Sequence, residues 1–262
     1  MTFGSVLLRL ITAIAVTLIM GPIIVVLIVS FSSGELLTFP LPGFSLRWFY
    51  NFFSLPEMRN AFALSLILAF TSATAAVLLG MMGAIYTSRR DSWLSHILQL
   101  LFITPLVFPT IVLGLALLLL YRTFGMWITP GLFIAHVIVC LPYAFRAVLA
   151  SLQSFDVSLE DAGQSLGAGP IRSFTLITLP IIWPGILSGW LFAFVVSFGE
   201  LNVGLFLTGP GVVTLPIEIF SYLQFQGSQL VVAAASALQI LVIIVILLVA
   251  KQLIGAKRIA QR

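Results

Sequence analysis

The chain has 262 residues, of which 61% are hydrophobic and only 8% are charged. Soluble domains carry about a quarter charged residues, so this composition excludes a water-soluble globular protein and indicates a polytopic membrane protein. The net charge is only +4 and the basic residues form no continuous stripe, which excludes nucleic acid as a partner.

Six apolar runs are long enough to cross a bilayer, because a helix needs about 20 residues to span the hydrocarbon core. They predict an all-α fold in which residues 1–262 form a single transmembrane domain. The first run is too long for a signal peptide and no cleavage site follows it, so we expect it to be retained. The runs lie at about 7–31, 61–87, 94–120, 126–149, 180–207 and 230–254.

Prolines interrupt several of these runs, with Pro105 and Pro109 in the third and Pro142 in the fourth. A proline removes a backbone donor and kinks a helix, and the freed carbonyl then needs a partner within the protein or in a wet cavity. Small residues such as Gly80 and Gly189 also recur, and they permit close helix packing. An ordinary packed bundle would explain any one of these residues, but together the broken helices favour a protein that moves.

The basic residues predict the orientation, because lysine and arginine gather in cytoplasmic loops. If the N-terminus is cytoplasmic, nine of the 12 basic residues fall in inner segments, so we expect both termini inside. The inner residues are Arg9, Arg89, Arg90, Arg146, Arg172, Lys251, Lys257, Arg258 and Arg262, and the outer ones are Arg47, Arg59 and Arg122.

The sequence contains no pattern for catalysis, for a metal or for a bound nucleotide. No glycine-rich phosphate loop, nucleophile elbow or paired zinc-ligand helix occurs. Cys140 is a single thiol inside an apolar run and is expected to be a small buried hydrophobe, and the two histidines, His96 and His136, are far apart. We therefore expect no catalytic residue, no metal and no cofactor on this chain.

The inner segment at 151–179 differs from the other short connectors, because it holds three of the chain's eight acidic residues. Ser158 is a candidate N-cap, and Glu160 and Asp161 would lie in the first turn of the helix that follows, where acids are favourable. Gly167 should end that helix. We expect a second short helix from Ile171 to Leu179, and thus a helix–turn–helix on the inner membrane surface.

A spaced pattern runs through this segment. Asp161-Ala162-Gly163 is followed after three residues by Gly167, and after nine more by Ile177-Thr178-Leu179-Pro180. The pattern resembles the cytoplasmic EAA loop of permease subunits in bacterial ATP-binding-cassette (ABC) importers. Asp replaces Glu and Gly replaces the second Ala, and Gly163 should weaken the helix by about 1 kcal/mol.

The resemblance implies a type I ABC importer permease fold in the bacterial inner membrane, surrounded by lipid. It also implies three partners: a dimer of ATPase subunits that holds ATP and magnesium, a second permease subunit, and a periplasmic solute-binding protein. Closure of the ATPases would push a coupling helix in the loop. The residues that it assigns to this coupling are Asp161, Ala162, Gly163, Leu166, Gly167, Ala168, Ile177, Leu179 and Pro180.

Within this family, residues 197–203, 207–211 and 214–219 look like those of spermidine/putrescine-type permeases, although Gly199 replaces an expected acid. The resemblance therefore suggests Glu200 and Asn202 as substrate-path residues. Glu200 falls in the outer half of the fifth span or at its rim, where it could face a cavity that attracts a cation or could serve packing.

Other functions remain open at this point. An opine, an aminophosphonate or a ferric ion would suit the same architecture and would not need Glu200. A secondary transporter would need paired membrane carboxylates or inverted repeats, and the sequence offers one clear intramembrane acid and no obvious repeat. A membrane enzyme would need a nucleophile and a base in one span, and none is present.

Overall fold

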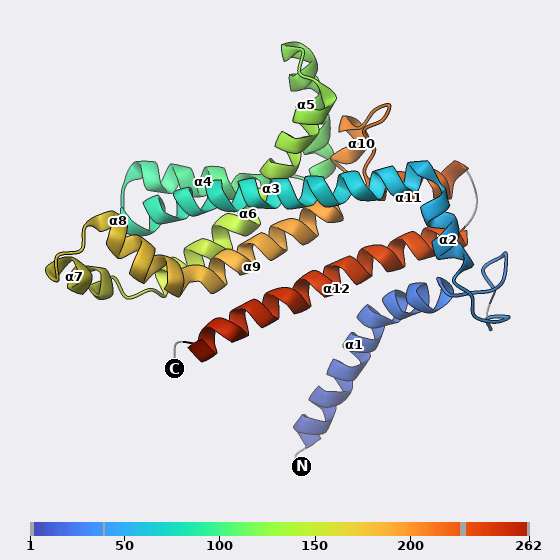
Figure 1. Cartoon of the computed structure of the whole chain (residues 1–262), viewed down its shortest axis with the longest axis horizontal. Helices are drawn as coiled ribbons and strands as arrows, with labels where there is room; N and C mark the ends of the chain where they lie inside the picture. Colours follow the sequence, from blue (N-terminus) through green and yellow to red (C-terminus); the bar gives the residue numbers. More distant parts are fainter. Residues whose placement is uncertain (1–2, 39, 226–228, 261–262) are drawn as a thin grey trace. The chain divides into compact units, whose positions relative to one another are not determined.

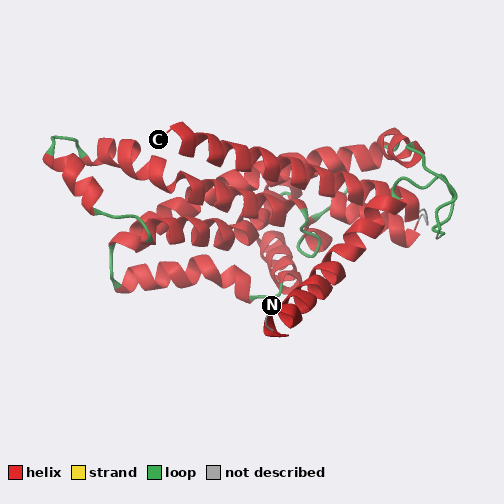
Figure 2. Cartoon of the chain, turned by 90° about the horizontal axis from the view of Figure 1, so that it is seen from below, coloured by secondary structure: helices red, strands yellow, loops and turns green. Residues whose placement is uncertain are grey.

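The computed structural model describes residues 3–38, 40–225 and 229–260. Over these ranges the backbone is helical between short loops and forms no β-strand, as Figure 2 shows, which confirms the all-α prediction. The helices are α1 Phe3–Val29, α2 Arg47–Ser54, α3 Pro56–Arg89, α4 Trp93–Val107, α5 Thr110–Phe124, α6 Ile128–Gln153, α7 Ser158–Ser165, α8 Pro170–Ser173, the π turn η1 Phe174–Thr178, α9 Leu179–Phe198, α10 Gly204–Leu207, α11 Leu215–Phe225 and α12 Gln229–Ala260.

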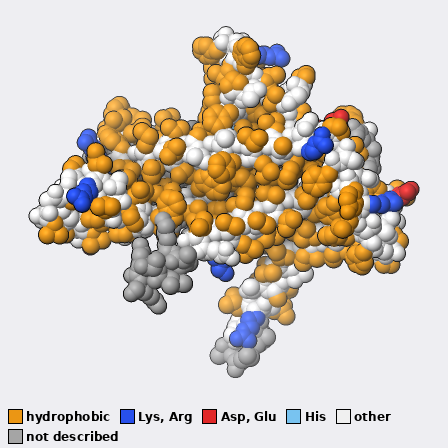
Figure 3. All heavy atoms as spheres, viewed as in Figure 1, with side chains coloured by type: hydrophobic (Ala, Val, Ile, Leu, Met, Phe, Trp, Pro, Cys, Tyr) orange, Lys and Arg blue, Asp and Glu red, His pale blue; other side chains and the backbone are white. Residues whose placement is uncertain are grey.

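Within the described part of the chain, five stretches of helix are long and apolar enough to cross a membrane, and the number becomes six if the bent pair α4 and α5 forms one span. Hydrophobic side chains cover most of the face shown in Figure 3, as a lipid-facing surface requires. The five stretches are Leu7–Val29, Pro56–Arg89, Ile128–Gln153, Pro170–Phe198 and Gln229–Leu253.

The predicted third span is not one straight helix. Its two halves, α4 and α5, meet at an angle of 107°, and Figure 1 shows α5 turning away from α4. Phe108 between them has φ −82° and ψ 139°, the extended conformation that a following proline imposes. Pro109 therefore breaks the run at 94–120, whereas Pro105 is accommodated inside α4.

The fifth span of the structure, Pro170–Phe198, begins and ends earlier than the predicted run at 180–207. Helix continues without a break from α8 through η1 into α9, so the expected second short helix of the loop is the first part of this span. Pro180 cannot donate to the carbonyl four residues before it, and the π turn at Phe174–Thr178 lets the helix pass this site. The helix ends at Phe198, before Gly199.

The contacts of the chain divide it into two compact units, and the prediction of a single domain stays a prediction. Residues 1–60 and 218–244 form the first unit. Its segment after α1 is tied by the Trp48 indole N–H, which donates to the Ser32 carbonyl at 2.9 Å, and by the Arg47 guanidinium, 4.3 Å from the centre of the Trp48 ring. The most apolar stretch of α1 buries no residue.

Residues 61–217 and 245–262 form the second unit, in which α6 packs against α4 and α9. The glycines predicted to permit close packing lie at close approaches. A Cβ on Gly80 would lie 2.9 Å from the backbone nitrogen of Phe145, and one on Gly189 would lie 3.1 Å from the Ala144 carbonyl oxygen. Neither helix pair could approach as closely with a larger residue.

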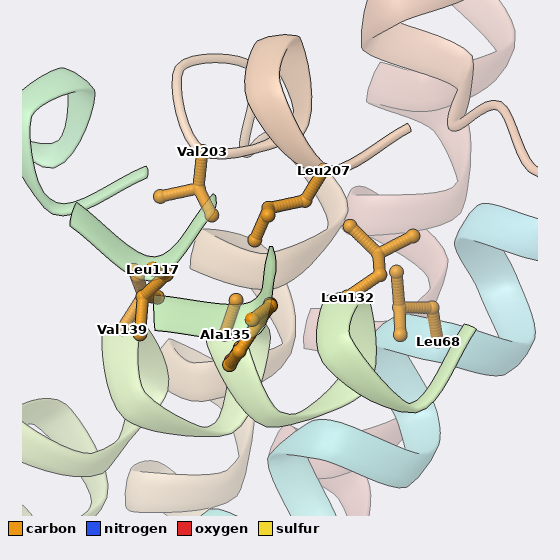
Figure 4. Packing of buried hydrophobic residues seen from close by; sticks show 8 residues of the cluster. Leu68, Leu117, Leu132, Ala135, Val139, Val203 and Leu207 are labelled. Carbon is orange, nitrogen blue, oxygen red and sulfur yellow. The ribbon is translucent and has the colours of Figure 1, made fainter. Parts of the chain in front are cut away.

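A hydrophobic cluster fills the region where α3, α5, α6 and the segment after α9 meet. Figure 4 shows its side chains converging from these elements. The cluster holds the turn beyond α9 against the bundle through Val203 and Leu207, which are almost fully buried. Its members are Leu68, Leu117, Tyr121, Leu132, Ala135, Val139, Val203 and Leu207.

Polar side chains tie three helices together in the interior of the second unit. The Ser197 hydroxyl of α9 lies 2.9 Å from the Ser72 hydroxyl of α3 and 2.8 Å from Nδ1 of His136 on α6. The Cys140 thiol donates to the Ala193 carbonyl at 3.1 Å and is fully buried, in agreement with its predicted role as a small buried residue.

Candidate functional site

The loop between α6 and α8 is shorter than the predicted segment 151–179, because α6 continues to Gln153 and helix resumes at Pro170. Its centre is α7, and the carboxylate of Asp156 caps this helix by accepting the backbone N–H of Ser158 at 3.0 Å. Hydrogen bonds from the Ser158 hydroxyl and backbone N–H hold the pKa of the Asp156 carboxyl below its ordinary value.

The predicted cap at Ser158 is thus wrong. The chain already turns before that residue, since the backbone N–H of Leu159 donates to the carbonyl of Asp156 at 3.2 Å. Ser158 is the first residue of the helix, and the side-chain acceptor comes from two residues earlier.

Gly167 ends α7, as the sequence predicts. Its φ is +90°, in the left-handed region that a side chain disfavours. The backbone N–H of Gly167 donates to the Gln164 carbonyl at 2.9 Å, and that of Ala168 donates to the Gly163 carbonyl at 3.1 Å. This pair of bonds is a Schellman motif, which satisfies the last carbonyls of the helix and turns the chain back toward α8.

Glu160 is the residue of α7 that the sequence reasoning did not single out for the site. Its side chain is only 6% exposed, and its Oε1 lies 2.5 Å from an Arg89 nitrogen at the end of α3. The Thr178 hydroxyl of η1 donates to the same oxygen, and the Ser173 hydroxyl of α8 donates to the Glu160 backbone carbonyl at 3.3 Å. A helical-wheel comparison of the two adjacent acids could have suggested that only one of them faces the bundle.

The adjacent acid, Asp161, is exposed, so the predicted coupling residues fall into two groups. Asp161, Ala162, Leu166 and Gly167 lie at the surface of the loop. The others lie closer to the helices. A Cβ on Gly163 would lie 2.6 Å from Cδ1 of Ile177, so the glycine lets α7 lie against η1. The remaining members are Ala168, which is half-buried, and Leu179 and Pro180, which are half-buried in the first turn of α9.

Large apolar side chains are exposed around α7. Leu166 is 90% exposed, Ile171 is 80% exposed and Val157 is 56% exposed. We call these three residues the loop patch. Their position beside polar, solvent-exposed residues of a short amphipathic helix is typical of a surface that another protein covers.

The predicted substrate-path residues lie just beyond α9. Glu200 is 9% exposed, and its Oε1 accepts the backbone N–H of Val203 at 3.1 Å. Asn202 is exposed, and its side-chain amide donates to the Thr110 hydroxyl at the start of α5, at 2.9 Å. The structure therefore brings both residues to one turn, although they do not bond to each other.

A cavity of about 350 Å³ lies near this turn, between α5, α6 and α10. Tyr121, Arg122, Trp127 and Thr208 are among the residues that line it, whereas Glu200 and Asn202 are not. The residues that the structure describes hold no group of three or more His, Cys, Asp or Glu side chains that could bind a metal ion.

Comparison with known proteins gives one family model and several relatives. Residues 76–258 match the family described as the binding-protein-dependent transport system inner membrane component. The putrescine transport system permease protein PotI of Escherichia coli K12 is 37% identical over 213 residues, which cover 78% of this chain and 75% of the relative. The spermidine/putrescine transport system permease protein PotC of the same organism is 31% identical over 238 residues, which cover 89% and 88%.

A solved structure has the same fold. It is the crystal structure of a bacterial ABC transporter involved in the import of the acidic polysaccharide alginate, and it superimposes with a TM-score of 0.72. The match covers 99% of this chain and 96% of the other chain, at 18% sequence identity.

Proposed function

Because the chain belongs to the family of binding-protein-dependent transport system inner membrane components, we propose that it is the membrane-spanning permease subunit of an importer that takes up a polyamine with energy from ATP. Family membership supports a transport permease over the secondary transporter and the membrane enzyme. The observation that carries the proposal is α7, a short exposed helix with the spacing of the EAA loop, supported by transmembrane helices at its back. The relatives named for putrescine and spermidine support the substrate class.

Hydrolysis of ATP is proposed to belong to separate subunits. The sequence of this chain contains no glycine-rich phosphate loop, so ATP and magnesium would be held by a partner ATPase dimer. The loop patch and the exposed carboxylate of Asp161 offer an apolar and an acidic contact to such a partner. Closure of the dimer would push α7 and thereby rock the helices behind it.

Two further partners belong to the proposal. A second permease subunit would complete the translocation path, and the exposed α1 would face either that subunit or lipid. A periplasmic binding protein would deliver the solute at the outer side. The alginate transporter is described in a complex with a periplasmic protein, which supports such an arrangement within the same fold.

The orientation follows from the basic residues, and we propose an inner membrane protein with both termini in the cytoplasm. Reporter fusions after Gly209 and after Arg262 should report opposite sides of the membrane. If both reported the same side, the orientation and the inner position of α7 would fail together.

The environment of Glu200 supports the proposal that the transported solute is a cation. Its carboxylate is buried, and among the described residues no lysine or arginine pairs with it. A buried carboxylate without a cation is costly, and a positively charged solute that passes nearby would offset that cost.

The test is uptake by the whole complex. The chain is assembled with its ATPase, second permease and binding protein in proteoliposomes, and uptake of radiolabelled putrescine and spermidine is measured with ATP inside. We expect uptake that requires ATP hydrolysis and the binding protein. Uptake of an opine, an aminophosphonate or ferric ion in place of polyamines would overturn the substrate, and uptake driven by an ion gradient without ATP would overturn the mechanism.

A further inference from the structure

One carboxylate joins three parts of the second unit at the inner end. Oε1 of Glu160 on α7 accepts a hydrogen bond from a guanidinium nitrogen of Arg89 at 2.5 Å and another from the hydroxyl of Thr178. These partners are 71 and 18 residues away in the sequence, at the last residue of α3 and the last residue of η1. The contact is therefore tertiary and links elements that no local turn connects.

The burial of this carboxylate makes its partners indispensable. The Glu160 side chain is 6% exposed, whereas that of Arg89 is 41% exposed. A buried charge is tolerated only when it is paired and hydrogen-bonded, and removal of one partner leaves the other uncompensated. The arginine, by contrast, can be solvated when the pair is broken. Breaking the pair should therefore destabilise the position of α7 more than that of α3.

The rest of α7 is fitted to the same support. Ser173 donates to the Glu160 backbone carbonyl, and Gly163 leaves room for Ile177 of η1. The π turn lies directly opposite Glu160, and π turns inside helices are frequently found at functional sites. The exposed side of α7, with Asp161 and Leu166, remains free for a partner.

From this geometry we propose that Glu160 is a positioning residue that fastens α7 to α3 and to the inner end of α9, so that a push on α7 moves both helices as one body. Glu160 touches neither the ATPase nor the solute. Its loss would leave the exposed contacts of α7 intact and would let the helix shift without moving its support. ATP hydrolysis would then continue while transport falls. This inference rests on the proposed function for its transport readout.

The first test is the ratio of solute taken up to ATP hydrolysed in the reconstituted complex. Glu160→Gln and Arg89→Ala should each lower this ratio roughly tenfold or more, because either change removes the ion pair that holds α7 to α3, while ATP hydrolysis is retained. Arg89→Lys keeps the charge and should retain most of the coupling. Arg90→Ala is the matched control, because Arg90 lies 5.3 Å over the Tyr86 ring and does not contact Glu160.

The second test reads the position of α7 without transport. Hydrogen exchange of the amides in Ser158–Ser165 should be roughly tenfold faster in the complex with Glu160→Gln, and unchanged with Arg90→Ala. Faster exchange with an unchanged coupling ratio would overturn the proposal, and so would unchanged exchange. A wild-type complex that takes up no polyamine would count against the proposed function alone, and the exchange rates would then decide the attachment of α7 by themselves.

Discussion

Two glutamates are buried among the described residues, and they are held in opposite ways. Glu160 on α7 is 5% exposed and is paired with Arg89, a residue of another helix. Glu200, in the turn beyond α9, is 9% exposed and accepts a backbone N–H from Val203, only three residues away. One carboxylate is neutralised by a distant cation, and the other is bonded locally without a cation from the described chain.

Glu160 is thus a carboxylate that holds structural elements together, whereas the negative charge of Glu200 is not paired with a cation of the described chain. The Glu160 carboxylate is paired with a cation of the protein itself, so its loss should disturb the packing of α7. The Glu200 carboxylate shapes a turn through a hydrogen bond that a neutral amide could also make, so the turn does not need its negative charge. Substitutions at the two carboxylates should therefore have different consequences for transport and for folding.

The largest effect should follow deletion of Asp161–Ala168. The deletion removes the end of α7, its glycine turn and Leu166 of the loop patch, while every predicted span stays intact. We expect uptake to be abolished and the protein to insert normally, as measured by transport and by ATPase pull-down from membranes. Wild-type uptake by the deleted chain would remove α7 from the coupling mechanism.

A smaller but still large effect should follow Gly163→Leu. The side chain would enter the space of Ile177 and push α7 away from η1, and overpacking of this kind costs about 1–3 kcal/mol. We expect the coupling ratio to fall about tenfold, which corresponds to about 1.4 kcal/mol. Gly163→Ala is the matched control, because the end of the Ile177 side chain can move and alanine favours the helix, so near-normal coupling is expected.

In the turn beyond α9, Glu200→Gln should weaken polyamine uptake several-fold without lowering the amount of protein in the membrane. The glutamine oxygen can still accept the Val203 N–H, so the turn is preserved and only the charge is lost. Glu200→Ala removes both and should also lower the amount of protein. An equal loss of protein with glutamine would indicate a packing role, and normal uptake would take Glu200 out of the substrate path.

The glycine turn offers a finer comparison. Gly167 and Gly169 both have open space where a Cβ would lie, but only Gly167 has a positive φ. Gly167→Ala should therefore cost about 1–2 kcal/mol in the end of α7, whereas Gly169→Ala should be nearly neutral. Hydrogen exchange at Ala168 would measure the difference, and equal effects of the two substitutions would contradict the strained turn.

The smallest effect should follow Asp156→Ala, which removes the exposed cap of α7. We expect faster exchange of the Ser158 amide and less than a twofold change in uptake, on the order of other exposed local contacts. The pKa of this carboxyl is lowered in the folded protein, so its support is complete above its ordinary pKa of 3.8 and is lost as the pH falls through the lowered value. Exchange that responds to acid equally in wild type and variant would contradict the cap.

Much of the fold could be predicted because lipid permits few backbone conformations for a segment that crosses the membrane. A run of about 20 apolar residues must become a helix to satisfy its own backbone. Among the described residues five such runs did so, four of them near the predicted positions and the fifth at Pro170–Phe198 in place of 180–207. The run at 94–120 does not form one straight helix. Pro109 indicates a break in this run, but the sequence does not distinguish a kink from a turn of 107°. How far a proline bends a helix depends on what the two halves pack against.

The candidate site was predictable in part. The spacing around Gly167 indicated a helix that ends in a left-handed residue, because few residues other than glycine adopt that conformation. The predicted loop is too long, because Pro180 indicates the start of a span whereas the helix begins at Pro170. The π turn that carries helix past that proline needs the surroundings of η1, which local sequence does not describe.

The sequence by itself determined that this chain is a bundle of membrane helices with one polar helix between two of them. These properties depend on residue type and spacing along the chain. Only the tertiary structure decided which of two adjacent acids is buried. Glu160 and Asp161 carry the same charge and lie in the same helix. The side chain of Glu160 is the buried one because Arg89 and Thr178 both bond to it on its side of α7. That convergence joins residues 71 positions apart, and only folding brings such groups together.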